Sequence, residues 1–176
     1  MLVCASAAVA QPAQVIVFRH AEKPLDDANP HLSVRGQERA AALAWYLDSN
    51  LMYTNYGRPV AIFAANPTAD APSQRTVETV TPFAERIAVP IDTTFSAVQF
   101  HELASEIATN SNYQGKTVVI CWPHDQIPAL AHALGVRAVA DWKAHDFSHL
   151  LVIRYTTNRA RMFHIAERLL FGDPAH

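Results

Sequence analysis

The chain has 176 residues, half of them hydrophobic, with 14 basic and 16 acidic side chains and a formal net charge of −2 at pH 7. This length suits one domain with a substantial core. Neither sign of charge forms a run, and no apolar stretch reaches the ~20 residues that cross a bilayer. We therefore expect a single domain over residues 11–176, without a nucleic-acid partner or a stable membrane insertion. Oligomeric partners cannot be predicted from these features.

The first ten residues are small and apolar and end in Ala8-Val9-Ala10, the pattern that signal peptidase cleaves. Because a positively charged start is missing, we interpret residues 1–10 as the remnant of a signal peptide and expect a secreted or periplasmic protein. A buried N-terminal strand in a cytoplasmic protein is the alternative. Cleavage would remove Cys4 and leave Cys121 without a disulfide partner, and we expect Cys121 to be a buried hydrophobic residue.

Three contiguous apolar runs rich in β-branched and aromatic residues predict strands buried on both faces. They cover residues 15–18, 60–64 and 117–122. The first stops at Arg19 and His20, and the third stops at Pro123, His124 and Asp125. Residues 89–92 predict a short edge strand, because proline is tolerated there. Residues 149–155 and 161–165 predict a hairpin.

Between these strands, apolar residues recur at the spacing of a helix face. One helix is predicted after an N-cap at Ser33 and a second after a cap at Ser73, and Pro82 should kink or restart the second. Residues 102–108 predict a third helix, and Pro128 opens a fourth. Alternating strands and helices predict an α/β fold, a three-layer sandwich with a mostly parallel central sheet and helices on both faces.

The carboxyl ends of parallel strands lie along one rim, so Arg19, His20, Arg75 and His124 can meet there. Two guanidinium groups can bind a phosphoryl group through paired hydrogen bonds. A neutral imidazole can attack phosphorus near pH 7, and the resulting phosphoimidazole is open to hydrolysis. This chemistry requires neither a metal nor a cofactor.

The sequence also resembles the histidine phosphatase superfamily, which has the phosphoglycerate-mutase-like fold, over roughly residues 15–135. The resemblance rests on four motifs, which occur in this order: Arg19-His20-Ala-Glu-Lys, Leu32-Ser-x-x-Gly36-x-x-Arg39-Ala40, Ser73-x-Arg75-x-x-Glu78-Thr79 and His124-x-x-Ile127-Pro128. It implies that His20 becomes phosphorylated, that Arg19 and Arg75 hold the phosphoryl oxygens, and that His124 completes the pocket.

The sequence departs from the usual pattern of this superfamily at Ala21 and Pro123, where many members have glycine. The methyl group of Ala21 should be tolerated unless the backbone there needs a positive φ. Pro123 fixes the approach of His124 and should not remove it.

The resemblance leaves two carboxyl groups as the candidate general acid. Asp125 directly follows His124, as in the acid-phosphatase branch, and we favour it for that reason. Glu102 lies between Arg75 and His124, as in the mutase-like branch, but a solvated first-turn helix residue is the alternative interpretation. Lys23 has a weaker claim to contact an anionic substrate, because an exposed loop lysine is the default.

We therefore predict a phosphatase that hydrolyses a phosphate monoester, of a small molecule or a protein, through a phosphohistidine. A mutase is disfavoured, because the chain has little material for a lid that excludes water. One alternative is a phosphate-binding module without turnover. The other is a metal-dependent hydrolase that uses His101, His145 and His149, although their spacing is not that of metal ligands.

Overall fold

The strands form a single sheet at the centre of the molecule. The computed structural model describes residues 11–26, 28–156 and 159–174, so residues 1–10, on which the signal-peptide interpretation rests, lie outside it. Within these ranges the sheet has six strands in the order β3-β2-β4-β1-β5-β6. Their bounds are β1 (Gln14–Arg19), β2 (Ala61–Ala64), β3 (Ile91–Asp92), β4 (Thr117–Trp122), β5 (His149–Thr156) and β6 (Arg159–Ala166). The first four are mutually parallel, whereas β5 is antiparallel to both β1 and β6.

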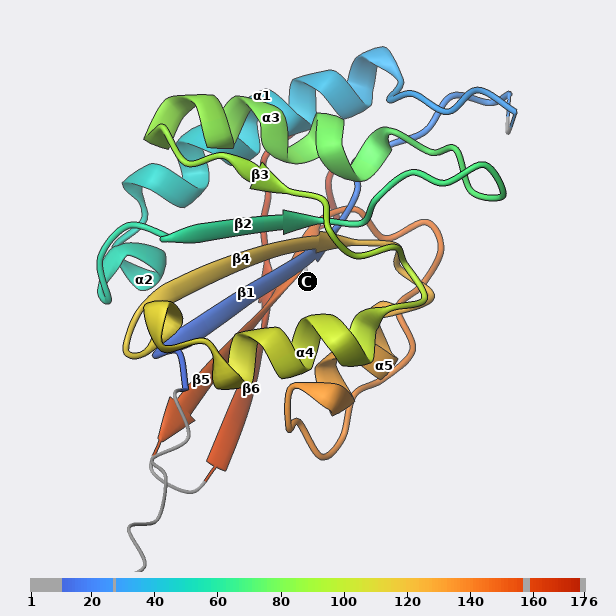
Figure 1. Cartoon of the computed structure of the whole chain (residues 1–176). Helices are drawn as coiled ribbons and strands as arrows, with labels where there is room; N and C mark the ends of the chain where they lie inside the picture. Colours follow the sequence, from blue (N-terminus) through green and yellow to red (C-terminus); the bar gives the residue numbers. More distant parts are fainter. Residues whose placement is uncertain (1–10, 27, 157–158, 175–176) are drawn as a thin grey trace, which may run out of the picture.

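Helices cover both faces of this sheet (Figure 1). One face packs against α1 (Val34–Ser49), α2 (Leu51–Thr54) and α3 (Arg75–Ile87), and the other against α4 (Phe100–Thr109) and α5 (Ile127–Ala133). A short 3₁₀ helix, η1 (Ser111–Tyr113), precedes β4. Because side chains alternate along a strand, Ile16 and Phe18 enter the core under α1 and α3, whereas Val15 and Val17 enter the core under α4 and α5. The predicted three-layer α/β sandwich is confirmed.

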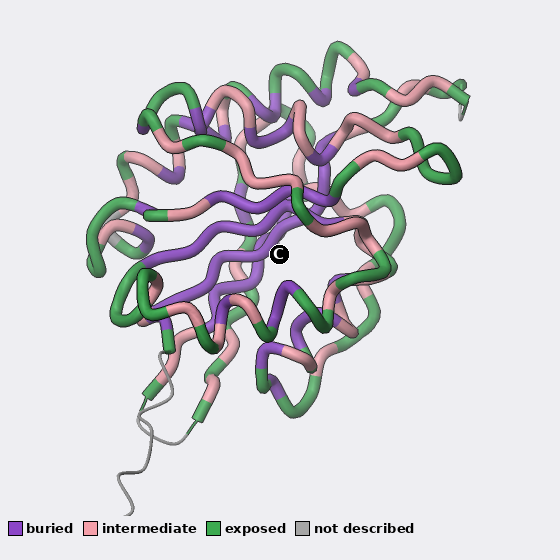
Figure 2. The backbone as a smooth tube through the Cα atoms, in the orientation of Figure 1, coloured by how far each residue is buried: buried purple, intermediate pink, exposed green. Residues whose placement is uncertain are grey.

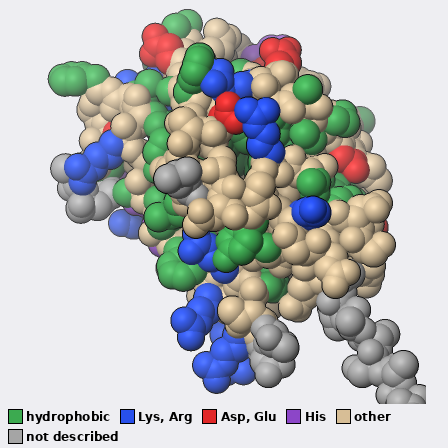
Figure 3. All heavy atoms as spheres, turned by 90° about the vertical axis from the view of Figure 1, so that its left-hand side faces the viewer, with side chains coloured by type: hydrophobic (Ala, Val, Ile, Leu, Met, Phe, Trp, Pro, Cys, Tyr) green, Lys and Arg blue, Asp and Glu red, His purple; other side chains and the backbone are tan. Residues whose placement is uncertain are grey.

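The inner strands are the most buried part of the chain (Figure 2). All six residues of β1 and all six of β4 are buried, as their contiguous apolar runs predict. Even the polar Gln14 is fully buried, and its Nε2 donates to the Tyr53 carbonyl at 2.7 Å. On the face of the molecule shown in Figure 3, lysine and arginine side chains lie among neutral and hydrophobic ones. None of the described helices is long and apolar enough to span a membrane.

Helix α1 begins as predicted, whereas α3 does not. The Ser33 hydroxyl accepts the Gly36 N–H at 3.0 Å and caps α1. The N-cap of α3 is Gln74 rather than Ser73, and its side chain makes no capping bond. Its backbone N–H instead donates to the Pro30 carbonyl at 2.9 Å, so the neighbouring loop takes the place of a local cap. The prediction of a Ser73 cap is therefore wrong.

Helix α3 is continuous through Pro82, so the predicted restart does not occur. Proline removes one intrahelical hydrogen bond, but Val80, Phe83 and Ala84 are all buried against the sheet. Tertiary packing thus offsets the lost bond. The edge strand and the hairpin are confirmed, and β5 and β6 extend slightly beyond their predicted ends, with residues 157–158 outside the described part of the chain.

Candidate active site

The site lies at the carboxyl ends of the three adjacent parallel strands β2, β4 and β1. Arg19 is the last residue of β1, His20 follows it, and Arg75 is the first residue of α3, after the loop that leaves β2. His124 lies in the turn after β4. Arg19, Arg75 and His124 each lower the pKa of His20 electrostatically, so the structure brings the four predicted residues together.

His20 is only 7% exposed, and its ring is fixed by its own chain. Its Nδ1 lies 2.7 Å from the Ala21 carbonyl oxygen. Because a carbonyl can only accept, we assign the proton to Nδ1, which leaves the lone pair on Nε2. Burial lowers the pKa of His20 to about 4, and the neighbouring cations act in the same direction. His20 is therefore a neutral imidazole near pH 7, the form in which it can act as a nucleophile.

Arg19 is almost completely buried at the end of β1. Its Nη1 donates to three backbone carbonyls of one loop: Ala144 at 2.6 Å, and Lys143 and Asp146 at 3.3 Å. Burial lowers the pKa of Arg19 to about 10, which still leaves the guanidinium charged at neutral pH. Its Nε is buried and has no hydrogen-bond partner among the described residues.

Arg75 offers a second donor of the same kind. Its Nη2 donates to the Asn29 carbonyl at 2.9 Å, and its buried Nε likewise lacks a partner in the described part of the chain. A buried N–H without an acceptor is costly, and native structures contain few of them. Two such guanidinium donors around a neutral imidazole fit a site that takes a tetrahedral oxyanion, which would accept both.

The turn that carries His20 rests on the start of α1. The Glu22 carbonyl accepts the Ser33 N–H at 2.9 Å and the Ser33 hydroxyl at 3.1 Å. A Cβ atom at Gly36 would lie only 2.3 Å from the same carbonyl oxygen. Glycine at position 36 therefore allows the helix to approach this turn, which gives the second sequence motif a structural reason.

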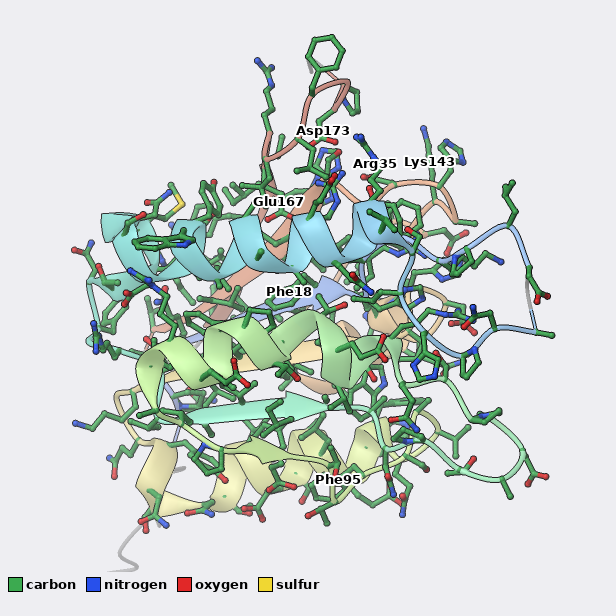
Figure 4. All side chains as sticks on the ribbon, turned by 90° about the horizontal axis from the view of Figure 1, so that it is seen from above. Phe18, Arg35, Phe95, Lys143, Glu167 and Asp173 are labelled. Carbon is green, nitrogen blue, oxygen red and sulfur yellow. The ribbon has the colours of Figure 1, made fainter. Side chains whose placement is uncertain are left out.

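An ion-pair network between α1 and the C-terminal segment also supports this turn. Arg39 is 3% exposed, and its Nη2 lies 2.8 Å from Glu22 Oε1 and 2.6 Å from Asp173 Oδ1. In Figure 4, Asp173 lies beside Arg35 at the start of α1. The Asp173 carboxylate also accepts the N–H groups of Leu169 and Leu170, so it attaches the C-terminal segment to the site. The sequence analysis missed Asp173, and no local pattern marks it.

Ala21 is accommodated as expected. Ala88 is the one non-glycine residue with positive φ in the described ranges, so Ala21 needs no left-handed backbone. The Ala21 N–H donates to Thr79 Oγ1 at 2.9 Å, and the Thr79 hydroxyl donates to the Arg75 carbonyl at 2.6 Å. One threonine thus links the His20 turn to the helix that presents Arg75.

Asp125, which is exposed in the turn after β4, acts electrostatically on two of the predicted site residues, whereas Glu102 is not among the main charges that act on them. Burial and then Arg19 lower the pKa of the half-buried His124, whereas Asp125 raises it and Lys23 lowers it. Asp125 also acts on Arg19. Glu102 is exposed in the first turn of α4 and is not among the main charges that shift the pKa of His20, Arg19 or His124.

The three histidines considered as metal ligands do not form a metal site, and Cys121 belongs to the core. His101 and His145 are exposed, whereas His149 is buried, with Nδ1 2.7 Å from Asp146 Oδ1. Among the described residues no three His, Cys, Asp or Glu side chains form a group that could hold a metal ion. Cys121 is fully buried, which raises the pKa of its thiol and confirms its interpretation as a core residue.

No protein-family model and no curated protein matches this sequence. Solved structures do match. The protein histidine phosphatase SixA, in complex with tungstate, has a TM-score of 0.58 at 12% identity, over 87% of this chain and 96% of its own. A mycobacterial glucosyl-3-phosphoglycerate phosphatase has a TM-score of 0.58 at 14% identity, over 88% and 98%. A phosphoglycerate mutase from Plasmodium falciparum has a TM-score of 0.57 at 11% identity, over 93% and 97%. The chain therefore has the phosphoglycerate-mutase-like fold that these phosphatases and this mutase share.

Proposed function

We propose that the protein is a phosphatase of the histidine phosphatase superfamily that hydrolyses a phosphate monoester through a phosphohistidine at His20. One observation carries the proposal: a buried neutral imidazole, with its lone pair on Nε2, lies among cations that include two buried guanidinium N–H groups without partners. The structural neighbours support it, because SixA is a protein histidine phosphatase with bound tungstate, and the mycobacterial phosphatase also has a complex with inorganic phosphate.

In the proposed reaction, Arg19 and Arg75 bind the phosphoryl oxygens, and His124 donates a further hydrogen bond. His20 Nε2 attacks phosphorus as the bond from phosphorus to the ester oxygen breaks. The leaving oxygen takes a proton from a carboxylic acid, for which we propose Asp125. Water then attacks the phosphohistidine and gives its proton to that carboxylate, which releases inorganic phosphate and regenerates neutral His20.

The direct test is hydrolysis of p-nitrophenyl phosphate by wild type, His20→Ala and Arg75→Ala. Turnover by wild type and its loss in His20→Ala are expected, with a large rise in KM for Arg75→Ala. If the protein were only a phosphate-binding module, phosphate would protect it from unfolding while no p-nitrophenol appeared. If it were a metal-dependent hydrolase, a chelator would abolish turnover and zinc or another divalent ion would restore it.

The choice of general acid is tested by comparing Asp125→Asn with Glu102→Gln. The group that protonates the leaving oxygen matters most when that oxygen is a poor leaving group. We therefore expect Asp125→Asn to slow hydrolysis of an alkyl phosphate far more than that of p-nitrophenyl phosphate. A selective loss in Glu102→Gln instead would assign the role to Glu102.

The predicted export stays a proposal that rests on residues 1–10, outside the described part of the chain. Expression in a bacterium with a periplasm, with a positively charged and apolar signal start placed ahead of residue 1, followed by N-terminal sequencing, tests it. A periplasmic product that begins at Gln11 is expected, and an unprocessed cytoplasmic product would contradict the proposal.

A further inference from the structure

A loop more than a hundred residues away in sequence holds the phosphate-binding arginine. The loop, Lys143–Phe147, precedes β5, and three of its backbone carbonyls accept hydrogen bonds from Nη1 of Arg19. The Phe147 ring covers the guanidinium, with its centroid 3.9 Å from the central carbon. The same ring lies 6.3 Å from the His20 imidazole at an interplanar angle of 56°. Phe147 therefore contacts the arginine and lies near the nucleophile.

These contacts restrict the orientation of the Arg19 guanidinium. A guanidinium is a rigid plane, so acceptors at one corner and an aromatic ring over one face together limit its rotation. The loop carbonyls engage Nη1 and not Nε, which is the buried donor left without a partner in the described residues. The loop thus binds Arg19 through Nη1, and Nε stays available for the proposed phosphoryl group.

Hydrogen bonds from residues other than Arg19 also hold the loop in place. Trp142 Nε1 donates to the Asp146 carbonyl at 2.9 Å, and the Asp146 carboxylate accepts the Ser148 N–H at 3.2 Å. The same carboxylate lies 2.7 Å from His149 Nδ1, at the start of β5. Residues of the loop also line a pocket of about 790 Å³, and Arg19 is not among the residues that line it. A braced loop of this kind can impose a geometry on the arginine.

Packing alone does not explain Phe147. Its side chain is only partly buried, and it belongs to none of the described hydrophobic core clusters. Lys143 and His145, which flank the carbonyls, are exposed. The most specific contact of the Phe147 ring is therefore the charged group of Arg19.

We propose that Phe147 is a positioning residue, which fixes the Arg19 guanidinium so that its remaining N–H groups face the phosphoryl group. This inference rests on the proposed function. Phe147→Leu retains an apolar side chain but removes the ring, and a cation–π contact of this kind corresponds to a loss of about 3- to 30-fold in kcat/KM. Because Arg19 binds the phosphoryl group before reaction, we expect mainly a rise in KM. Inhibition by orthovanadate should weaken as well.

A double-mutant cycle with Arg19→Met, which removes the cation, tests whether Phe147 acts through the arginine. In the Arg19→Met background, Phe147→Leu should change kcat/KM less than twofold. With Arg19 intact, Phe147→Tyr keeps the ring and should show wild-type KM. Phe163→Leu is the matched control, because Phe163 lies 5.4 Å from the guanidinium of Arg154, on the β5–β6 hairpin. It should leave both kinetic constants unchanged.

Additive losses in the cycle, or wild-type KM in Phe147→Leu, would overturn the positioning role while the proposed function stands. Should Phe147→Leu fail to fold, the orthovanadate affinities of Phe147→Met and Phe147→Tyr decide the matter: weakening by Met alone supports the role, and equal affinities refute it. A wild-type protein that neither hydrolyses p-nitrophenyl phosphate nor binds phosphate would instead overturn the proposed function and this inference together.

Discussion

Gly36 makes a strong test of how the fold sets the geometry of the site. An alanine Cβ at this position would lie 2.3 Å from the Glu22 carbonyl oxygen. This separation is about 1 Å shorter than the closest ordinary C···O contacts, near 3.3 Å. The helix is fixed by its cap and its buried face, so the turn that carries His20 has to move, and the hydrogen bonds of Glu22 with Ser33 weaken.

The effect on activity should be larger than the effect on stability. Displacing a reacting group by about 1 Å costs on the order of 10²-fold in rate. In contrast, Gly→Ala inside a helix gains about 1 kcal/mol of propensity, which offsets much of a clash cost of about 1–3 kcal/mol. We therefore expect Gly36→Ala to lose about 100-fold in kcat/KM while its free energy of unfolding falls by no more than about 2 kcal/mol.

Steady-state hydrolysis of p-nitrophenyl phosphate and urea unfolding, measured on the same preparations, check this prediction. Gln37→Ala is the control, because Gln37 is the next residue of α1 and is exposed. It should retain wild-type activity and stability. The reasoning would be refuted if Gly36→Ala kept the wild-type kcat/KM and its free energy of unfolding rose as helix propensity alone predicts. The α1 contact would then not fix the turn that carries His20.

Three further predictions concern charges around the site. Arg39→Met should cost about 3–5 kcal/mol of unfolding free energy, because it leaves the Glu22 and Asp173 carboxylates without their buried partner. Arg35→Met, whose side chain is 46% exposed, should cost less than about 1 kcal/mol in the same urea titration, and equal costs would contradict the assignment. Glu167 is 2% exposed, and burial raises its pKa to about 8, so the unfolded chain ionises it first and stability falls as the pH rises from 4.5 to 8. Glu167→Gln should therefore stabilise the protein at pH 8, by on the order of 1–3 kcal/mol, and not at pH 4; a gain that does not grow with pH would refute this. Burial lowers the pKa of His20 to about 4, so the unfolded state binds the extra proton between about pH 6.5 and 4, and His20 weakens the fold as the pH falls through that window. An NMR titration of the ligand-free protein should show a neutral His20 ring down to pH 5, and a midpoint near 6.5 would contradict the burial argument.

The parts of the site that could be predicted from sequence are those encoded locally. Arg19 and His20 directly follow an apolar run, and His124 follows another, so strand periodicity and the rule for parallel sheets place them together. Ser33 could be predicted as an N-cap from its place before a helix-face pattern, whereas Gly36 was expected only through the superfamily motif. The structure adds the physical reason for that glycine, which is the approach of α1 to Glu22.

The parts that sequence reasoning missed depend on contacts between distant segments. Asp173 reaches Arg39 from 134 positions away, and nothing near Asp173 distinguishes it from a surface carboxylate. The α3 start was misplaced because its N-terminal N–H is satisfied by Pro30, not by a side chain beside it. The loop on Arg19 acts through backbone carbonyls, which any sequence supplies, so only the fold reveals it.

The central claim is that His20 becomes covalently phosphorylated, and acid-free quench trapping tests it most directly. Wild type and His20→Ala are mixed briefly with a ³²P-labelled phosphate monoester and denatured in base. We predict base-stable, acid-labile label on the wild-type chain and none on His20→Ala. Label at the wild-type level on His20→Ala would contradict the assignment of the nucleophile.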